Sequence, residues 1–137
     1  MAGQNTGEKI MSHRILVIDD EEAVRKSFIL ALDQPDYQVD VADSGQLGLK
    51  LFVSKSYDLI FLDLKMPGKS GVETLRDLRA LDAEVPIYII TAFDDEYFSQ
   101  LIAAAADGIN FEIISKPLGS ERISLIAMLV FNCAKGM

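Results

Sequence analysis

The stretch that decides the fold is Tyr57-Asp58-Leu59-Ile60-Phe61-Leu62-Asp63-Leu64-Lys65-Met66-Pro67-Gly68, a short apolar run that ends in a carboxylate and a turn. Residues 59–62 contain no polar side chain, which is typical of a strand buried on both faces of a parallel sheet. A carboxylate such as Asp63 is costly in a core unless it is paired or bound. Because Pro67-Gly68 is a strong turn signal, the pattern predicts a central strand that carries Asp63 at a ligand-binding edge. This stretch alone leaves open an Asp that only caps a loop.

Four more apolar runs lie on either side of this stretch, and helical patterns separate them. The predicted strands are 14–18, 37–42, 86–90 and 111–115, besides the one that ends at Asp63. The predicted helices are 21–33, 46–54, 70–81, 95–106 and 120–134. Ser44 and Ser70 stand where N-caps are expected, and Asp107-Gly108 is a C-cap signal.

Alternating strands and helices with short connections predict an α/β fold. Right-handed crossovers then favour a doubly wound five-stranded parallel sheet in the flavodoxin-like order 2-1-3-4-5, with helices on both faces. The first, third and fourth runs are the most apolar and should be central. A chain of 137 residues has the size of one domain. We expect a flexible leader over residues 1–12, which are polar and lack an apolar signal core, and one domain over residues 13–137.

The composition narrows the function classes. Acidic residues outnumber basic residues 21 to 13, and the net charge of −8 argues against a surface that grips nucleic acid. An acidic chain does suit a protein that gathers carboxylates around a cation. No stretch approaches the roughly 20 apolar residues of a membrane span. The single Cys133 excludes an internal disulfide and suggests helix packing, and the lone His13 is not expected to act as a ligand or base.

Polar side chains follow four of the predicted strands: Asp19-Asp20, Asp63, Thr91 and Lys116. The carboxyl ends of parallel strands lie on one edge of the sheet, so these residues should converge on one cleft. Three crowded carboxylates repel one another and need a cation, and hard oxygen ligands suit Mg²⁺. With Lys116 as a point charge and Thr91 as a hydroxyl donor, the set predicts phosphoryl transfer.

An aspartate is ordinarily ionised at neutral pH, so Asp63 can itself be the nucleophile and no separate general base is required. Each residue of the set also has an ordinary structural explanation: Asp20 as a helix cap, Thr91 as a turn hydroxyl and Lys116 as a solvated charge. The argument for function rests on four polar strand ends occurring together.

The sequence resembles the receiver domain of bacterial two-component response regulators, of the chemotaxis-regulator type, over about residues 12–134. The motifs that carry the resemblance are Ile-Leu-Val-Ile-Asp19-Asp20-Glu, Leu-Ile-Phe-Leu-Asp63-Leu-Lys-Met-Pro-Gly, Ile-Ile-Thr91-Ala and Ile-Ser-Lys116-Pro. It implies a cytoplasmic signalling switch in a phosphorelay, not an enzyme that acts on other substrates. Such a domain catalyses only its own phosphorylation and slow dephosphorylation. The implied partners are a histidine kinase or phosphotransfer protein and an output domain or target protein.

The resemblance also implies metal and acceptor roles. Asp63 would accept the phosphoryl group from a phosphohistidine. Asp20 would bind Mg²⁺ directly together with Asp63, and Asp19 would act at least partly through water. The backbone carbonyl of Lys65 would complete the protein ligands.

The other implied roles concern the phosphoryl group once it is bound. Thr91 would move to hydrogen-bond it, and Lys116 would pair with it. The Lys116-Pro117 peptide would be cis, which proline makes tolerable.

One departure from the family concerns the switch aromatic, a Tyr or Phe three residues before the Lys. Ile113 stands at that position, and the nearby Phe111 should point to the same side of the strand one pleat earlier. The resemblance therefore leaves the chemistry intact but does not explain how the site would reach the usual output face.

The last predicted helix carries a second apolar stripe. If Ile123, Ile126 and Val130 face the sheet, then Leu125, Met128 and Phe131 lie on or near the outer face. An outward apolar patch predicts a partner, either a second copy of the chain or an output domain.

Two rival functions remain open from the sequence. A pseudo-receiver would keep the fold and bind proteins without phosphate, and the missing switch aromatic is its best support. A phosphatase of the haloacid dehalogenase type also uses an Asp nucleophile, but that family has Asp-x-Asp after its first strand, whereas Asp19 and Asp20 are adjacent.

Overall fold

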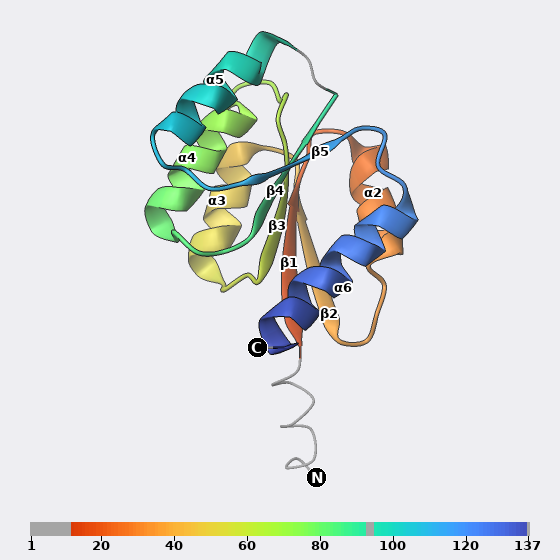
Figure 1. Cartoon of the computed structure of the whole chain (residues 1–137). Coiled ribbons are helices and arrows are strands. Elements are labelled where there is room, and N and C mark those ends of the chain that lie inside the picture. The colour runs from red at the N-terminus through yellow and green to blue at the C-terminus, as the bar shows by residue number, and fades with distance from the viewer. Residues whose placement is uncertain (1–11, 93–94, 137) are drawn as a thin grey trace.

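The computed structural model describes residues 12–92 and 95–136. Its strands form one parallel sheet in the order β2-β1-β3-β4-β5, so the predicted order is confirmed. The strands are β1 (His13–Ile18), β2 (Tyr37–Ala42), β3 (Leu59–Asp63), β4 (Ile87–Thr91) and β5 (Glu112–Ser115). The polar residues that follow β1, β3, β4 and β5 therefore lie along one edge of the sheet, the upper edge in Figure 1.

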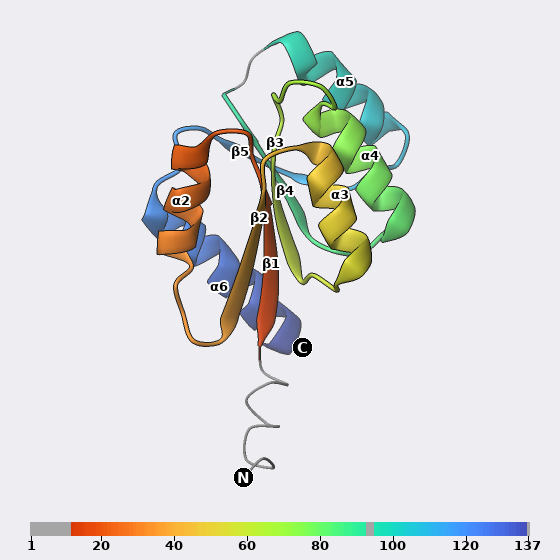
Figure 2. The same ribbon diagram turned by 180° about the vertical axis from the view of Figure 1, so that it is seen from behind.

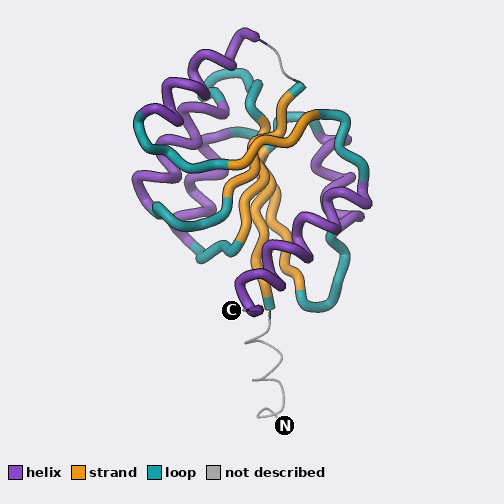
Figure 3. The backbone as a smooth tube through the Cα atoms, viewed as in Figure 1, coloured by secondary structure: helices purple, strands orange, loops and turns teal. Residues whose placement is uncertain are grey.

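Helices cover both faces of this sheet (Figures 1 and 2). They are α2 (Glu22–Ala31), α3 (Gly45–Ser54), α4 (Gly71–Leu81), α5 (Asp95–Ala106) and α6 (Ser120–Gly136). One face carries α3, α4 and α5, and the other carries α2 and α6, as the tube in Figure 3 also shows. The predicted α/β class with a doubly wound sheet is thus confirmed.

The apolar run of the opening stretch forms the centre of the core. All five residues of β3 are buried, and β3 lies between β1 and β4. Ile60 pairs with Leu16 on one side and with Ile87 on the other. Because successive strand residues face opposite sides, β3 contributes to both core clusters, one under α3, α4 and α5 and one under α2 and α6.

The helix caps are the ones that the sequence predicts. The Ser44 side chain accepts a hydrogen bond from the Leu47 N–H at 3.1 Å and starts α3. Ser70 and Glu73 form a capping box, with hydrogen bonds of 3.2 and 2.9 Å, so α4 begins directly after the turn that follows β3. Gly108, with φ +88°, follows the C-terminus of α5.

The prediction for α6 is wrong at Phe131. Ile123, Ala127 and Phe131 form its buried stripe, spaced four residues apart, and Ile126 and Val130 are partly buried beside them. The Phe131 ring stacks on His13 with centroids 4.0 Å apart and meets Tyr37 edge-on at 5.3 Å. The His13 and Tyr37 rings thus bury Phe131, so the buried face of α6 is wider than the helical periodicity alone suggests. Leu125 and Met128 are exposed, as predicted, and so is Leu129.

Phe111 and Ile113, which the sequence predicts on the same side of the last strand, differ in burial. Phe111 is partly buried against the core cluster under α5, whereas Ile113 is 41% exposed on the edge strand β5. The predicted leader over residues 1–12 lies almost wholly outside the described residues, and so does the side chain of Cys133. Among the helices of the described residues, none has the length and hydropathy that a membrane span requires.

Candidate functional site

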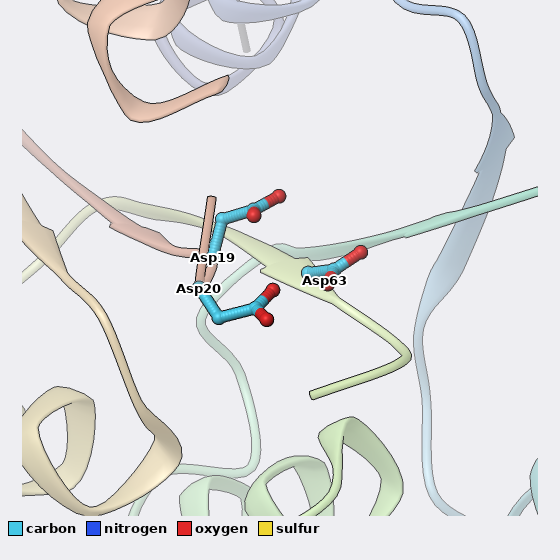
Figure 4. Close-up of side chains that lie close together, drawn as sticks. All are labelled: Asp19, Asp20 and Asp63. Carbon is cyan, nitrogen blue, oxygen red and sulfur yellow. The ribbon is translucent and has the colours of Figure 1, made fainter. Parts of the chain in front are cut away.

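The three acidic residues predicted to meet do meet at the carboxyl edge of the sheet. Asp19 and Asp20 follow β1, and Asp63 ends β3. One carboxylate oxygen from each lies within 4.8 Å of those of the other two. Asp19 and Asp63 are only 2% and 3% exposed, while Asp20 is exposed to solvent. Figure 4 shows the three side chains side by side at the strand ends.

Asp19 is held in place by groups from α2 and the turn before it. Its Oδ1 accepts a hydrogen bond from the Glu21 N–H at 2.8 Å, and its backbone carbonyl accepts one from Arg25 Nη1 at 2.9 Å. Its own N–H donates to the Ala42 carbonyl at 3.0 Å. The turn that presents Asp19 and Asp20 is therefore fixed from three sides.

Lys116 reaches the same place from the other end of the edge. Its Nζ lies 2.9 Å from Asp63 Oδ1, and its backbone N–H donates to the Thr91 carbonyl at 2.8 Å. Thr91, at the end of β4, is buried. The Lys116-Pro117 peptide is cis, as the resemblance implies. The side chains of Asp19, Asp20, Asp63 and Lys116 thus meet at one region of the sheet edge, and Thr91 ends the strand β4 beside them.

Burial dominates the electrostatics of the acidic pair. Desolvation raises the pKa of Asp63 to about 7, although the hydrogen bond from Lys116 opposes the shift. Desolvation also raises the pKa of Asp19, against the hydrogen bond from the Glu21 N–H. For Lys116, burial lowers the pKa, but the hydrogen bond and the charge of Asp63 raise it more, so the net shift is upward. A cation at the acidic cluster would offset the repulsion that these carboxylates share.

An open cleft of about 430 Å³ gives access to the cluster. Asp20, Asp63, Lys65 and Lys116 line it, in accord with their predicted places. Its other lining residues are Glu21, Met66, Pro67 and Tyr97, which sequence reasoning did not assign to the site. Glu21, Met66 and Pro67 are chain neighbours of predicted site residues, so adjacency could have found them. Tyr97 lies six residues beyond Thr91, and no sequence signal placed it at the cleft.

The donor set fits a divalent cation of the Mg²⁺ type. Hard carboxylate oxygens from one or two side chains, with the remaining positions left to water and phosphate, are what Mg²⁺ prefers. The exposed Asp20 and the cleft-lining Asp63 offer such oxygens on an open side. Lys65, whose backbone carbonyl the resemblance implies as a further ligand, lines the same cleft.

The chain is similar to response regulators by sequence and by structure. The response regulator MprA of Mycolicibacterium vanbaalenii is 35% identical over 113 residues, which make up 82% of this chain and 48% of MprA. The chain spans about half the length of the curated relatives it matches.

Solved structures show the same fold. A response regulator receiver domain protein from Clostridium thermocellum has a TM-score of 0.75 at 28% identity and covers 90% of this chain and 97% of its own. The chemotaxis protein CheY4 of Vibrio cholerae has a TM-score of 0.74 at 23% identity, with 87% of this chain and 98% of its own covered, and supports the fold alone.

The family model of the response regulator receiver domain matches residues 15–128, which include every strand end of the acidic site. This match covers most of the 137 residues, and the MprA relatives agree with it. The chain therefore belongs to the response regulator receiver domain family and is a regulatory domain of two-component signalling.

Proposed function

We propose that this receiver domain is a phosphoacceptor switch in which Asp63 takes a phosphoryl group from the phosphohistidine of a histidine kinase or phosphotransfer protein. The observation that carries the proposal is the setting of Asp63. Its carboxylate is buried at the edge of a cleft, 2.9 Å from the Lys116 ammonium and within 4.8 Å of two further carboxylates. A carboxylate in this setting has an oxygen for attack and a cation already placed beside it.

The transfer follows from these groups. An Asp63 oxygen attacks phosphorus, the P–N bond to the histidine breaks, and the leaving imidazole takes up a proton. Lys116 keeps its charge and moves from the carboxylate to a phosphoryl oxygen, while Thr91 supplies a hydroxyl donor on the neighbouring strand. When bound at Asp20 and Asp63, with Asp19 acting at least partly through water, Mg²⁺ supplies charge neutralisation for the phosphoryl oxygens.

Phosphorylation then acts as an electrostatic switch. The new group adds about −1.5 to −2 charges and three strong acceptor oxygens. Lys116 and Thr91 respond to it, and the balance between inactive and active surfaces shifts toward the form that controls an output partner. Hydrolysis of the acyl phosphate is slow and part of the regulation.

The test is direct phosphorylation of the purified chain. With phosphoramidate or acetyl phosphate and Mg²⁺, the wild type gains one phosphoryl mass that is lost on mild base or hydroxylamine treatment and maps to Asp63. Asp63→Asn gains none, whereas Asp43→Asn, which removes an exposed carboxylate at the same sheet edge, behaves as the wild type. A wild type that takes up no phosphoryl group would favour the pseudo-receiver, and multiple turnover on a generic phosphate ester would favour a phosphatase.

The exposed apolar surface on α6 that could contact a partner is smaller than the sequence predicts. Leu125 and Met128 remain exposed on α6, but Phe131 belongs to the core. We propose that a second copy of the chain docks through Leu125 and Met128. The receiver domain itself is proposed to cover residues 13–137. Sedimentation of the phosphorylated chain, compared with its Met128→Glu variant, tests this contact.

A further inference from the structure

Tyr97 belongs both to the phosphorylation cleft and to the core beneath α5. It lines the cleft together with Asp63 and Lys116. The same half-buried side chain packs against the core cluster under α3, α4 and α5. Among the cleft-lining residues of the described chain it is the sole aromatic side chain. Its phenol is a hydroxyl donor at the end of a rigid ring.

Tyr97 is also the first member of the buried stripe of α5. Leu101 and Ala104 follow it four and seven residues later, and both are fully buried. Residues at this spacing lie on one face of a helix. A displacement of the Tyr97 ring would therefore also displace the face of α5 that packs against the core.

Neither Phe111, just before β5, nor Ile113 on β5 has this double contact. Phe111 packs in the core and Ile113 faces outward, and neither lines the cleft. In the described part of the chain, α5 contacts the cleft through Tyr97.

We propose that Tyr97 is a binding residue for the phosphoryl group on Asp63: its hydroxyl donates a hydrogen bond to a phosphoryl oxygen, and this bond shifts the seating of α5. The inference rests on the proposed function. A phosphoryl group has three acceptor oxygens, and a charged acceptor makes hydrogen bonds about twice as strong as neutral ones. No bond is made or broken in this step, and the phenol keeps its proton.

The shift would be felt on the outer face of the same helix. Phe98 and Ile102 lie one turn apart on α5, and both are exposed apolar side chains. They are carried by the backbone that Tyr97 anchors, so occupancy of the cleft changes how they are presented to a partner.

The experiment compares Tyr97→Phe with Phe98→Ala, a change at the neighbouring aromatic that does not line the cleft. Each chain is loaded with Mg²⁺ and beryllofluoride, and hydrogen exchange of the α5 amides is measured with and without loading. Acyl phosphate formation on Asp63 is followed separately by mass spectrometry. We expect wild type and Phe98→Ala to show the same change in α5 exchange on loading. The change in Tyr97→Phe should be at most about one third of the wild-type change.

A second measurement uses the intrinsic fluorescence of the chain, which has four tyrosines and no tryptophan. Loading should change the tyrosine emission of the wild type and of Tyr37→Phe, whose ring lies in the aromatic cluster with His13 and Phe131. The change should be absent in Tyr97→Phe.

The outcomes separate the two proposals. If Asp63 is phosphorylated and Tyr97→Phe still shows the full response of α5, the role of Tyr97 is wrong and the phosphoacceptor function stands. If the wild type takes up no phosphoryl group, both fall. If Tyr97→Phe takes up the group while α5 no longer responds, the inference holds.

Discussion

At the scale of single residues, the site keeps a carboxylate where its charged form is unfavourable. Desolvation raises the pKa of Asp63 to about 7, and the nearby Asp19 adds to the shift while Lys116 opposes it. A carboxyl group whose pKa is higher in the folded chain than in the unfolded chain makes the folded chain less stable once it ionises. Ionised Asp63 should therefore lower the stability of the folded chain at neutral pH.

The first prediction is a pH-dependent gain from Asp63→Asn. Between about pH 5 and pH 7 the folded wild type holds a proton on Asp63 that the unfolded chain has lost, so its stability falls as the pH rises. The quantity to compare is the unfolding free energy of Asp63→Asn minus that of the wild type, measured in EDTA. This difference should be about 2 kcal/mol larger at pH 8 than at pH 5. Urea unfolding at both pH values measures the difference.

Asp43→Asn serves as the control for this measurement, because Asp43 is exposed at the same edge of the sheet. Its difference from the wild type should be the same at both pH values. An Asp63→Asn difference that does not change between pH 5 and pH 8 would show that Asp63 is ionised throughout this range.

At the scale of elements, the contact between β3 and α4 fixes the end of the strand that carries Asp63. Gly71, the first residue of α4, donates its N–H to the Leu64 carbonyl at 2.9 Å. A Cβ at Gly71 would lie 2.6 Å from Leu64 Cα and would also meet the backbone carbonyl of Asp63. These neighbours are backbone atoms, so a side chain at Gly71 would force α4 away from the strand end.

The second prediction is that Gly71→Ala destabilises the chain by about 2 kcal/mol, because overpacking outweighs the better helix propensity of alanine. It should also slow phosphorylation of Asp63, whose backbone is displaced. Thermal unfolding and the rate of acyl phosphate formation measure the two effects. Gly119→Ala is the matched control, since nothing lies within 4 Å of its added Cβ. Equal stability for the two variants would show that the start of α4 can move freely.

The elements differ in how far their roles could be predicted. β3 is apolar at every position before Asp63, so its central place followed from composition alone. The outer face of α6 did not follow, because its buried arc is widened by the His13 and Tyr37 rings that pack on Phe131. Those rings come from β1 and β2, and such contacts have no trace in the periodicity of the helix itself.

At the scale of the whole molecule, the sheet order explains why the site could be predicted. Once the order β2-β1-β3-β4-β5 is given, Asp19, Asp63, Thr91 and Lys116 must share one edge. The 2.9 Å pair between Lys116 and Asp63 depends on the conformation of the connection after β5. The place of Tyr97 depends on how α5 is seated. Neither is encoded in a local pattern.

The whole acidic cluster leads to the last prediction, which concerns metal-linked stability. Three carboxylates within 4.8 Å of one another repel. A cation that binds the folded chain but not the unfolded chain relieves this repulsion. Mg²⁺ at about 100 times its dissociation constant should therefore raise the unfolding free energy by about 2.7 kcal/mol relative to EDTA. Asp20→Asn should lose most of this gain, because it removes the exposed carboxylate of the cluster. Asp43→Asn, with the same loss of charge outside the cluster, should keep it. Denaturation with Mg²⁺, with Ca²⁺ and with EDTA measures the effect, and an equal Mg²⁺ gain in the two variants would place the cation elsewhere on this acidic chain.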